Sequence, residues 1–411
     1  MLSSPFDTDR RQSQFDLESF DNSQVIFVAD MYSSEYVGGA ELTTDAIIDN
    51  SNLNCFRLKS QQLSADLIQR GITKHWVFCN YTGMDQQLIP VVIANLSYSI
   101  VEYDYKFCKY RSIEKHENAE GKSCDCDNEM QGKITSAFFH GADNVFWMSQ
   151  KQSEIYTERF PFLSGGNNHI LSSVFTDSTL DRLKDLREQH AETKDNKWIV
   201  IGSTSWIKGA NEAENYCKDN DLEYEVVWGL PYDEMLEKLA QSKGHVYLPP
   251  GGDTCPRAVI EAKLAGCNLI LNENVQHKNE PWFSIDDVEE IELYLRGSTK
   301  RFWKIITDHI TKIPTVSGYT TTKDCIRQSY PFEQCIQSML GFCDQVVIVD
   351  GGSIDGTWER LEELSLDDDR IVIAQNIRDW NHPRFAVFDG LQKAYARSLC
   401  TSDWCWQQDS D

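Results

Sequence analysis

Residues able to do chemistry are concentrated in the stretch LPPGGDTCPRAVIEAK, at positions 248–263. Pro256 suits the first turn of a helix, where its missing N–H costs nothing, and the amides of such a turn attract anions. Arg257 would add a cation at the start of this helix. Asp253 before the helix and Glu261 inside it can accept hydrogen bonds from sugar or ribose hydroxyls. The stretch therefore predicts a site for a sugar diphosphate.

Two other loops offer contacts to the same phosphates. Gly38 and Gly39 lie between an apolar run and a helical pattern, where glycine lets backbone N–H groups approach an anion. A simple glycine turn is the alternative interpretation. Lys208, in the loop IGSTSWIKG, can neutralise phosphate charge. These loops indicate a phosphate site assembled from two half-domains.

A second group of candidates lies in QVVIVDGGSIDGT, at positions 345–357. Asp350 ends an apolar strand pattern, and an acid at the carboxyl end of a parallel strand points into the ligand crevice. Asp355 precedes the next helix. A strand–turn–helix capped by Ser353 and Asp355 is the alternative. We expect Asp350 to hydrogen-bond a base or a ribose.

The sequence closes on Asp409, Ser410 and Asp411, an acid-x-acid pair after a short apolar run. Carboxylate oxygens are hard ligands that suit Mn²⁺ or Mg²⁺, and such an ion can neutralise a leaving diphosphate. A solvated acidic pair is the other interpretation. The pattern favours a metal site at Asp409 and Asp411.

Cys108, His116, Cys124 and Cys126 have the side-chain types that bind a structural zinc ion. The one-residue gap between the last two cysteines is tighter than the usual two. We expect a polar insertion with free thiols here rather than a structural zinc site.

The elements that must position these residues are short apolar runs separated by helical patterns. Such runs predict parallel sheets covered by helices on both faces, and so an α/β fold with Rossmann-type domains. The expected division is a loose leader at 1–23, domains at 24–190 and 191–310 with a bridging helix at 283–310, and a partial α/β domain at 311–411.

Composition narrows the class of partner. The 411 residues carry a net charge of −25, which argues against nucleic acid or an anionic membrane, because both need a basic surface. No apolar run is long enough for a transmembrane helix, and the polar start resembles no signal or transit peptide. Thirteen scattered cysteines fit reduced thiols, so a cytoplasmic location is expected.

Residues 24–308, with GGAE, G-x5-KG and an acid-x7-Glu helix, resemble the GT-B glycosyltransferases of family four. The resemblance implies two Rossmann-like domains around a nucleotide-sugar, and retaining transfer without a metal. Asp253 would face the donor sugar and Glu261 the ribose, as the catalytic candidates. Lys208 would contact the diphosphate, and the paired glycines would line the cleft.

The chain departs from that family at three places. Asp253 stands where glutamate is usual, Ser203 replaces an arginine, and Tyr103-Asp104-Tyr105 replaces a His-Asp pair. We expect Arg257 to supply the missing phosphate-binding cation.

Residues 314–411 resemble the donor-binding half of the GT-A glycosyltransferases of family two. The resemblance implies that Asp350 binds the uracil or ribose of a donor, with Thr321 and Asp355 nearby. Asp409 and Asp411 would hold Mn²⁺ or Mg²⁺. The half that carries the general base is not in the sequence, so we expect a truncated or vestigial domain that cannot complete inverting transfer.

Together these patterns predict a glycosyltransferase in polysaccharide or glycoconjugate biosynthesis. It would move a sugar from a nucleotide-sugar to a glycan or glycoconjugate. A GT-B-fold sugar epimerase and a non-catalytic nucleotide-sugar-binding or scaffold protein are the alternatives, the latter motivated by Ser203 and Asp253.

Overall fold

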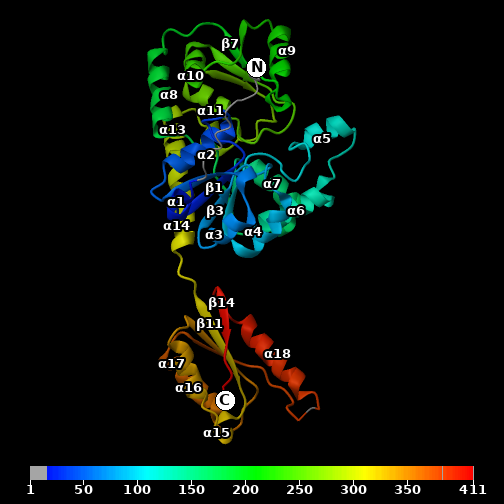
Figure 1. The fold of residues 1–411 in the computed structure, drawn as a ribbon, viewed down its shortest axis with the longest axis vertical. Helices are drawn as coiled ribbons and strands as arrows, with labels where there is room; N and C mark the ends of the chain where they lie inside the picture. The colour runs from blue at the N-terminus through cyan, green and yellow to red at the C-terminus, as the bar shows by residue number, and fades with distance from the viewer. Residues whose placement is uncertain (1–15, 382, 411) are drawn as a thin grey trace, which may run out of the picture. The chain divides into compact units, whose positions relative to one another are not determined.

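A computed structural model describes residues 16–381 and 383–410 of the protein. The chain divides into a first unit that ends at Ile310 and a second unit that begins at Thr311. Both are built from parallel sheets with helices between the strands (Figure 1). The predicted α/β class with parallel sheets is confirmed. Most of the predicted leader lies outside the described residues, and α1 (Leu17–Asn22) forms at its end with Phe20 buried.

The first sheet of the first unit has the strand order β2-β1-β3-β4-β5-β6, and every pairing is parallel. All residues of β1, β3 and β5 are buried, because helices cover both faces. The strands are β1 (Val25–Ala29), β2 (Cys55–Lys59), β3 (His75–Phe78), β4 (Ser97–Glu102), β5 (Asn144–Trp147) and β6 (Asn168–Ile170). The helices are α2 (Gly39–Asp49), α3 (Ala65–Arg70), α4 (Ile89–Asn95), α5 (Ile113–Glu120), α6 (Met130–His140) and α7 (Gln150–Arg159).

The second sheet of the first unit has the order β10-β9-β7-β8 and is also parallel. Its strands are β7 (Trp198–Ile201), β8 (Tyr224–Val227), β9 (Gly244–Tyr247) and β10 (Asn268–Leu271). Its helices are α8 (Asp177–Gln189), α9 (Ala210–Asp219), α10 (Tyr232–Gln241), α11 (Arg257–Leu264), α12 (Pro281–Ser284) and α13 (Val288–Arg296).

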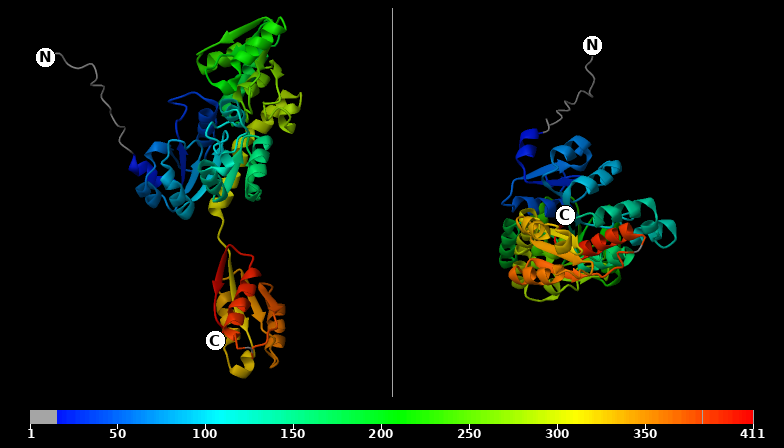
Figure 2. Two further views of the ribbon diagram at one scale, coloured as in Figure 1. Left: turned by 90° about the vertical axis from the view of Figure 1, so that its right-hand side faces the viewer. Right: turned by 90° about the horizontal axis from the view of Figure 1, so that it is seen from below.

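Helix α14 (Ser298–Thr311) returns from the second sheet to the first (yellow in Figures 1 and 2). The Phe302 ring lies 4.6 Å from the Phe146 ring, between ring centres. The indole N–H of Trp303 donates to the Ile47 carbonyl at 2.8 Å. One hydrophobic core therefore includes residues from both sheets, which fixes the two sheets within a single unit.

The second unit contains a third sheet of order β13-β12-β11-β14, with all pairings parallel. Ile336, Val346, Ile348 and Leu361 lie in its core. The edge strand β14 exposes all four of its side chains. The strands are β11 (Val316–Thr322), β12 (Gln345–Asp350), β13 (Ile371–Gln375) and β14 (Trp404–Gln407). The helices are α15 (Cys325–Gln328), α16 (Phe332–Leu340), α17 (Thr357–Asp367) and α18 (Phe385–Ser398).

Within the described part of the chain, every helix is too short or too polar to cross a membrane.

Candidate functional site

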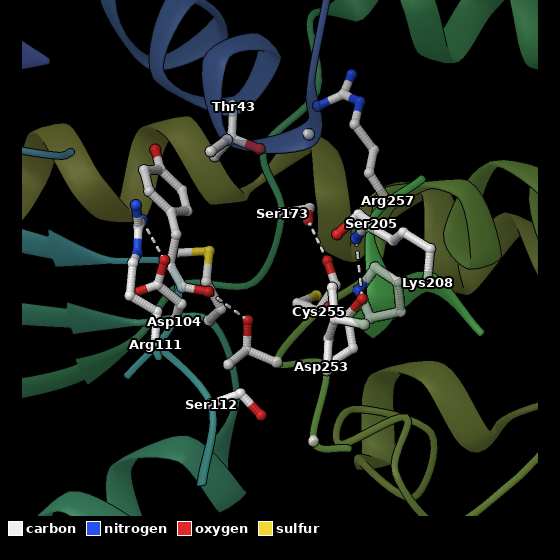
Figure 3. Close-up of a pocket in the computed structure, with 18 of the residues that line it drawn as sticks. Thr43, Asp104, Arg111, Ser112, Ser173, Ser205, Lys208, Asp253, Cys255 and Arg257 are labelled. Atoms are coloured by element: carbon white, nitrogen blue, oxygen red, sulfur yellow. Dashed lines mark hydrogen bonds and ion pairs between the residues drawn. The ribbon is translucent and has the colours of Figure 1, made fainter. Parts of the chain in front are cut away.

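A cavity of about 330 Å³ lies in the first unit, lined by loops that follow strands of both sheets (Figure 3). In the first sheet β1 lies between β2 and β3, and in the second sheet β7 lies between β8 and β9. The chain reverses its direction of progress across the sheet at these strands, and α/β folds bind ligands outside the carboxyl ends at such points. The topology therefore favours this cavity as a candidate ligand site.

Two helices begin at the cavity. Gly39 opens α2 and Arg257 opens α11, and a Cβ placed on Gly39 would lie 3.5 Å from the Arg257 Cβ. A Cβ on Gly38 would lie 2.3 Å from the Glu41 carboxylate, so that side chain would have to shift to admit a larger residue before α2. Neither helix receives a hydrogen bond from a capping side chain. Their first-turn N–H groups can therefore bind an anion.

Lys208 lies in the loop after β7 and Asp253 in the loop after β9, and the fold brings the two side chains together. The Lys208 Nζ lies 2.9 Å from the Asp253 Oδ2, and the Tyr247 hydroxyl donates to the same oxygen at 2.5 Å. Burial, followed by the Asp253 charge, raises the pKa of Tyr247 well above its usual value, so this hydroxyl stays a donor. The Lys208 side chain is 42% exposed and lines the cavity, which leaves its ammonium free to contact a ligand as well.

Arg257 and Glu261 form a buried pair on α11. The Arg257 Nε donates to the Glu261 Oε1 at 2.8 Å, and the guanidinium lies 3.8 Å from the centre of the Phe175 ring. The Tyr232 hydroxyl also donates to Glu261, at 2.5 Å. Arg257 lines the cavity, whereas Glu261 lies behind it. The carboxylate thus holds the arginine in place, and the predicted contact of Glu261 with a ribose stays a prediction.

The segment that follows β4 and includes the start of α5 contributes two cations that were not predicted from the sequence. Arg111 donates to the Asp104 carboxylate and, at 3.1 Å, to the Asn80 side-chain oxygen. Burial alone would lower the pKa of Arg111, but the Asp104 charge outweighs it and the pKa is raised. Lys115 on α5 lines the same cavity and is exposed. The signal for both was their position soon after a strand, in a polar stretch without periodicity.

A buried network fixes the start of this loop. The Lys106 Nζ lies 2.7 Å from the Glu102 Oε2, and the Tyr156 hydroxyl donates to Glu102 Oε1 at 2.7 Å. Burial raises the pKa of Glu102, and the adjacent ammonium opposes that rise. A buried charge is tolerated only when it is paired and hydrogen-bonded in this way. The network therefore anchors the segment that carries Asp104 and Arg111.

Thr43 on α2 offers a further polar group to a ligand. Its side chain is 1% exposed and lines the cavity, and its Oγ1 has no hydrogen-bond partner among residues 16–381 and 383–410. Burying a hydroxyl without a hydrogen bond costs free energy. A bound ligand would supply the missing partner.

Charge distinguishes the cavity from the rest of the protein. Its lining includes four cationic side chains, of Arg111, Lys115, Lys208 and Arg257, but only two carboxylates, of Asp104 and Asp253. The whole chain has a net charge of −25. A locally positive cavity of this volume fits a small anionic ligand such as a nucleoside diphosphate.

In the second unit, Asp350 is buried at the end of β12. This is the residue predicted to bind the uracil or ribose of the nucleotide-sugar. Its Oδ1 accepts from the N–H groups of Gly352 at 2.9 Å and Ser353 at 2.8 Å. Its Oδ2 accepts from the hydroxyls of Thr322 at 2.9 Å and Ser353 at 2.6 Å. The carboxylate therefore organises the loop that follows β12.

The other predicted residues of the second unit also have protein partners. Asp355 accepts from the N–H groups of Arg327 at 2.7 Å and Thr357 at 3.1 Å, and the Thr321 carbonyl accepts from the Ser410 hydroxyl at 2.9 Å. Asp409 lies 2.8 Å from the Lys393 Nζ, which lowers the carboxyl pKa. Asp411 lies outside the described residues. The donor-binding and metal-binding roles of these residues stay predictions.

The sequence matches no protein-family model and no curated protein. The fold is similar to that of Anabaena HepE in complex with UDP-glucose, with 11% identity over 69% of this chain and 92% of that chain and a TM-score of 0.41. It is also similar to AviGT4, a glycosyltransferase involved in avilamycin A biosynthesis, with 9% identity over 70% of this chain and 96% of that chain and a TM-score of 0.36. A third similar structure is an alpha-glucosyltransferase in complex with UDP-glucose and DNA containing an abasic site, with 11% identity over 70% of this chain and 99% of that chain and a TM-score of 0.34. At these TM-scores, any function must be inferred from the cavity itself.

Proposed function

We propose that the first unit is a glycosyltransferase that uses the cavity to bind a nucleotide-sugar and passes the sugar to a glycan or glycoconjugate. The observation that carries this proposal is the convergence of four cationic side chains and two helix starts on one cavity of an acidic protein. Those groups suit a diphosphate, which carries its charge on several oxygens.

Each part of the cavity has a role in this proposal. Lys208, Arg111 and Lys115 bind the diphosphate together with the first amides of α2 and α11. They stabilise the negative charge that grows on the diphosphate as the sugar departs, which is the main electrostatic task of such a site. Asp253 accepts hydrogen bonds from sugar hydroxyls, because Tyr247 and Lys208 occupy only one of its two oxygens.

Arg257 and Glu261 act behind the diphosphate. Glu261 fixes the guanidinium of Arg257, which then faces the cavity near the start of α2. Because protein cations are aimed at the diphosphate, the proposed transfer needs no metal ion. Retention of configuration is proposed on the resemblance to GT-B enzymes alone.

For the second unit we propose only donor and metal binding. The third sheet reverses its order at β11, between β12 and β14, and Asp409 lies two residues after the end of β14. Ligands bind at such reversal points. Asp409 and Asp411 would hold Mn²⁺ or Mg²⁺ there.

The proposal is tested with the full chain and a panel of nucleotide-sugars. Release of nucleoside diphosphate and appearance of free or transferred sugar are measured with and without added Mn²⁺. We expect turnover without added Mn²⁺, and Lys208→Ala should weaken donor binding at least about tenfold by removing a charged contact to phosphate. The control is Lys218→Ala, which removes an exposed lysine of α9 that pairs with Glu214.

The other outcomes separate the alternatives. Binding weakened by Lys208→Ala, with no turnover of any donor, would indicate a non-catalytic binding protein. Release of an epimerised free sugar would indicate an epimerase. Binding and turnover untouched by Lys208→Ala would remove the cavity from the mechanism.

A further inference from the structure

Four side chains that bind metals in proteins converge beside the cavity in the first unit. Cys108, His116, Cys124 and Cys126 are 1%, 1%, 7% and 0% exposed. Their ligand atoms all lie within 4.8 Å of one another. The His116 Nδ1 is 3.3 Å from the Cys126 Sγ and 3.8 Å from the Cys108 Sγ. The sulfur atoms and this ring nitrogen thus face a common point.

These separations fit a tetrahedral zinc ion. With Zn–S bonds of about 2.3 Å and a Zn–N bond of about 2.0 Å, the edges of the tetrahedron measure roughly 3.5–3.8 Å. The two distances from Nδ1 agree with such edges to within a few tenths of an ångström. The other ligand atoms lie within 4.8 Å of one another, so shifts of about 1 Å or less would admit the ion.

The surroundings of His116 also fit a metal ligand. The Nε2 atom is buried and has no hydrogen-bond partner in the described part of the chain, and the closest carboxylate oxygen of Asp125 lies 3.9 Å away. A metal-bound histidine commonly directs its other N–H toward a carboxylate, which fixes the ring orientation. Asp125 lies between two of the cysteines and is placed for that role.

Helix α5 itself buries little apolar surface. His116 is the only buried residue of α5, whose sequence IEKHENAE is otherwise almost entirely polar. A helix without an apolar face gains little from packing. A metal ion would substitute for the missing core, as it does in small metal-stabilised segments.

The loop that bears the last two cysteines is packed tightly against α6. A Cβ placed on Gly132 would lie 2.2 Å from the Cys126 carbonyl oxygen, so only glycine admits the loop at this position. The Arg159 guanidinium donates to the Cys124 carbonyl at 3.1 Å and to Asp127 at 2.9 Å. The two cysteines are therefore held near the ring of His116 by contacts that do not involve their sulfur atoms.

We propose that Cys108, His116, Cys124 and Cys126 bind one structural Zn²⁺ through three thiolates and the His116 Nδ1. The three thiols release their protons on binding, and the His116 Nε2–H points to Asp125. The sequence alone favoured free thiols because of the single-residue gap between the last two cysteines. In the structure a short 3-10 turn at Cys126–Asn128 brings both sulfur atoms to the same side.

The position of the zinc site gives it a consequence for the cavity. Tyr110, Arg111, Ser112 and Lys115 line the cavity and all lie between the ligands Cys108 and His116. A zinc ion bound to both Cys108 and His116 would hold the cations of Arg111 and Lys115 in place at the cavity. This consequence rests on the proposed function, whereas the metal content does not.

The first test is the metal content of the full chain, purified under reducing conditions. Elemental analysis should find about one zinc per chain, and replacement with Co²⁺ should give the visible bands of a tetrahedral cobalt–thiolate centre. The double variant Cys124→Ser/Cys126→Ser should lose the ion. Cys217→Ser, at a buried cysteine of α9, is the matched control and should keep it.

The cobalt spectrum of the unaltered chain decides the question even if the double variant does not fold. Absence of zinc together with absence of a cobalt–thiolate spectrum would overturn the proposal. An intact mass that shows a disulfide within this cluster in freshly purified protein would overturn it as well. Zinc present in a chain that binds no nucleotide-sugar would uphold the metal site and reject the proposed function.

Discussion

The cavity of the first unit and the loop after β12 in the second unit are built from similar sequence and differ in what their carboxylates face. Each places an aspartate beside glycines, with Asp350 as the last residue of a parallel strand and Asp253 in the loop after one. Asp253 lines an open cavity, and both of its side-chain contacts among residues 16–381 and 383–410 are to the same oxygen. Asp350 is fully buried and accepts three hydrogen bonds from its own loop and one from Thr322 at the end of β11. An acid at a strand end can thus serve a ligand or shape the backbone.

The lysines of the two regions also differ in whether they are available to a ligand or neutralise a carboxylate of the protein. In the cavity, Lys115 is exposed and Lys208 is partly exposed, although Lys208 also contacts Asp253. In the second unit, Lys393 lies between Asp389 and Asp409 and so neutralises a predicted metal ligand. A metal ion at Asp409 would have to displace this lysine.

The largest expected difference between the two units is in the loss of folding stability at acidic pH. His75, His245 and His277 are buried in the first unit, and burial lowers the pKa of each, to about 4, about 4 and about 3. The folded pKa is below the unfolded pKa, so unfolding takes up protons as the pH falls from about 6.5 toward 4. Stability should drop by about 1.4 kcal/mol per histidine for each pH unit in that window.

The second unit should respond at lower pH. Its Asp403 has a pKa lowered to about 2 by Lys312, so the stability that this carboxylate supplies is present above pH 3.8 and lost toward pH 2. Hydrogen exchange followed by mass spectrometry reports β3 and β12 separately. Equal loss of protection in both strands between pH 6.5 and 4 would contradict this difference.

Asp350→Ala should have the next largest effect. It leaves the N–H groups of Gly352 and Ser353 without their acceptor, and we expect the second unit to lose about 3 kcal/mol of stability. Hydrogen exchange of β12 measures the loss. Asp369→Ala, at an exposed acid, is the control and should change little.

Asp253→Asn should leave the fold almost unchanged and impair the cavity. The amide keeps an acceptor for the Tyr247 hydroxyl but removes the charge that Lys208 faces. Donor turnover should fall at least tenfold while the midpoint of thermal unfolding stays within a few degrees. A large loss of stability with normal turnover would make Asp253 a structural residue like Asp350.

The smallest effect is expected at Asp409. Its side chain is 57% exposed and its pair with Lys393 lies at the surface. Asp409→Asn should therefore change the stability of the second unit by less than about 1 kcal/mol. The proposed metal site predicts in addition that Mn²⁺ stabilises the unaltered chain and not this variant, as measured by thermal unfolding of the second unit.

The fold was largely predictable because buried parallel strands appear as continuous apolar runs. QVIFVAD contains β1, and QVVIVD coincides with β12 (Gln345–Asp350). Lys208 and Asp253 were predicted as site residues because strand, loop and helix follow one another closely around them. Their shared contact with Tyr247 is a tertiary feature that no local pattern contains.

Arg111 and Lys115 were missed for a physical reason. They lie in a polar segment without periodicity, and their place at the cavity depends on distant partners such as Asn80 and the buried Glu102 network. The convergence of Cys108, His116 and Cys124 was hidden in the same way. Spacing along the chain could not show that α5 and the following turn bring these side chains together.

The most direct test of the central claim is photo-crosslinking of the full chain with 5-azido-UDP-glucose, followed by peptide mapping. We expect labelled peptides from the first unit, in the loops after β7, β8 or β9, and loss of labelling when UDP is added or when Lys208 is changed to alanine. Labelling confined to the second unit, at the loops after β11 or β12, would contradict the assignment of the donor site to the cavity.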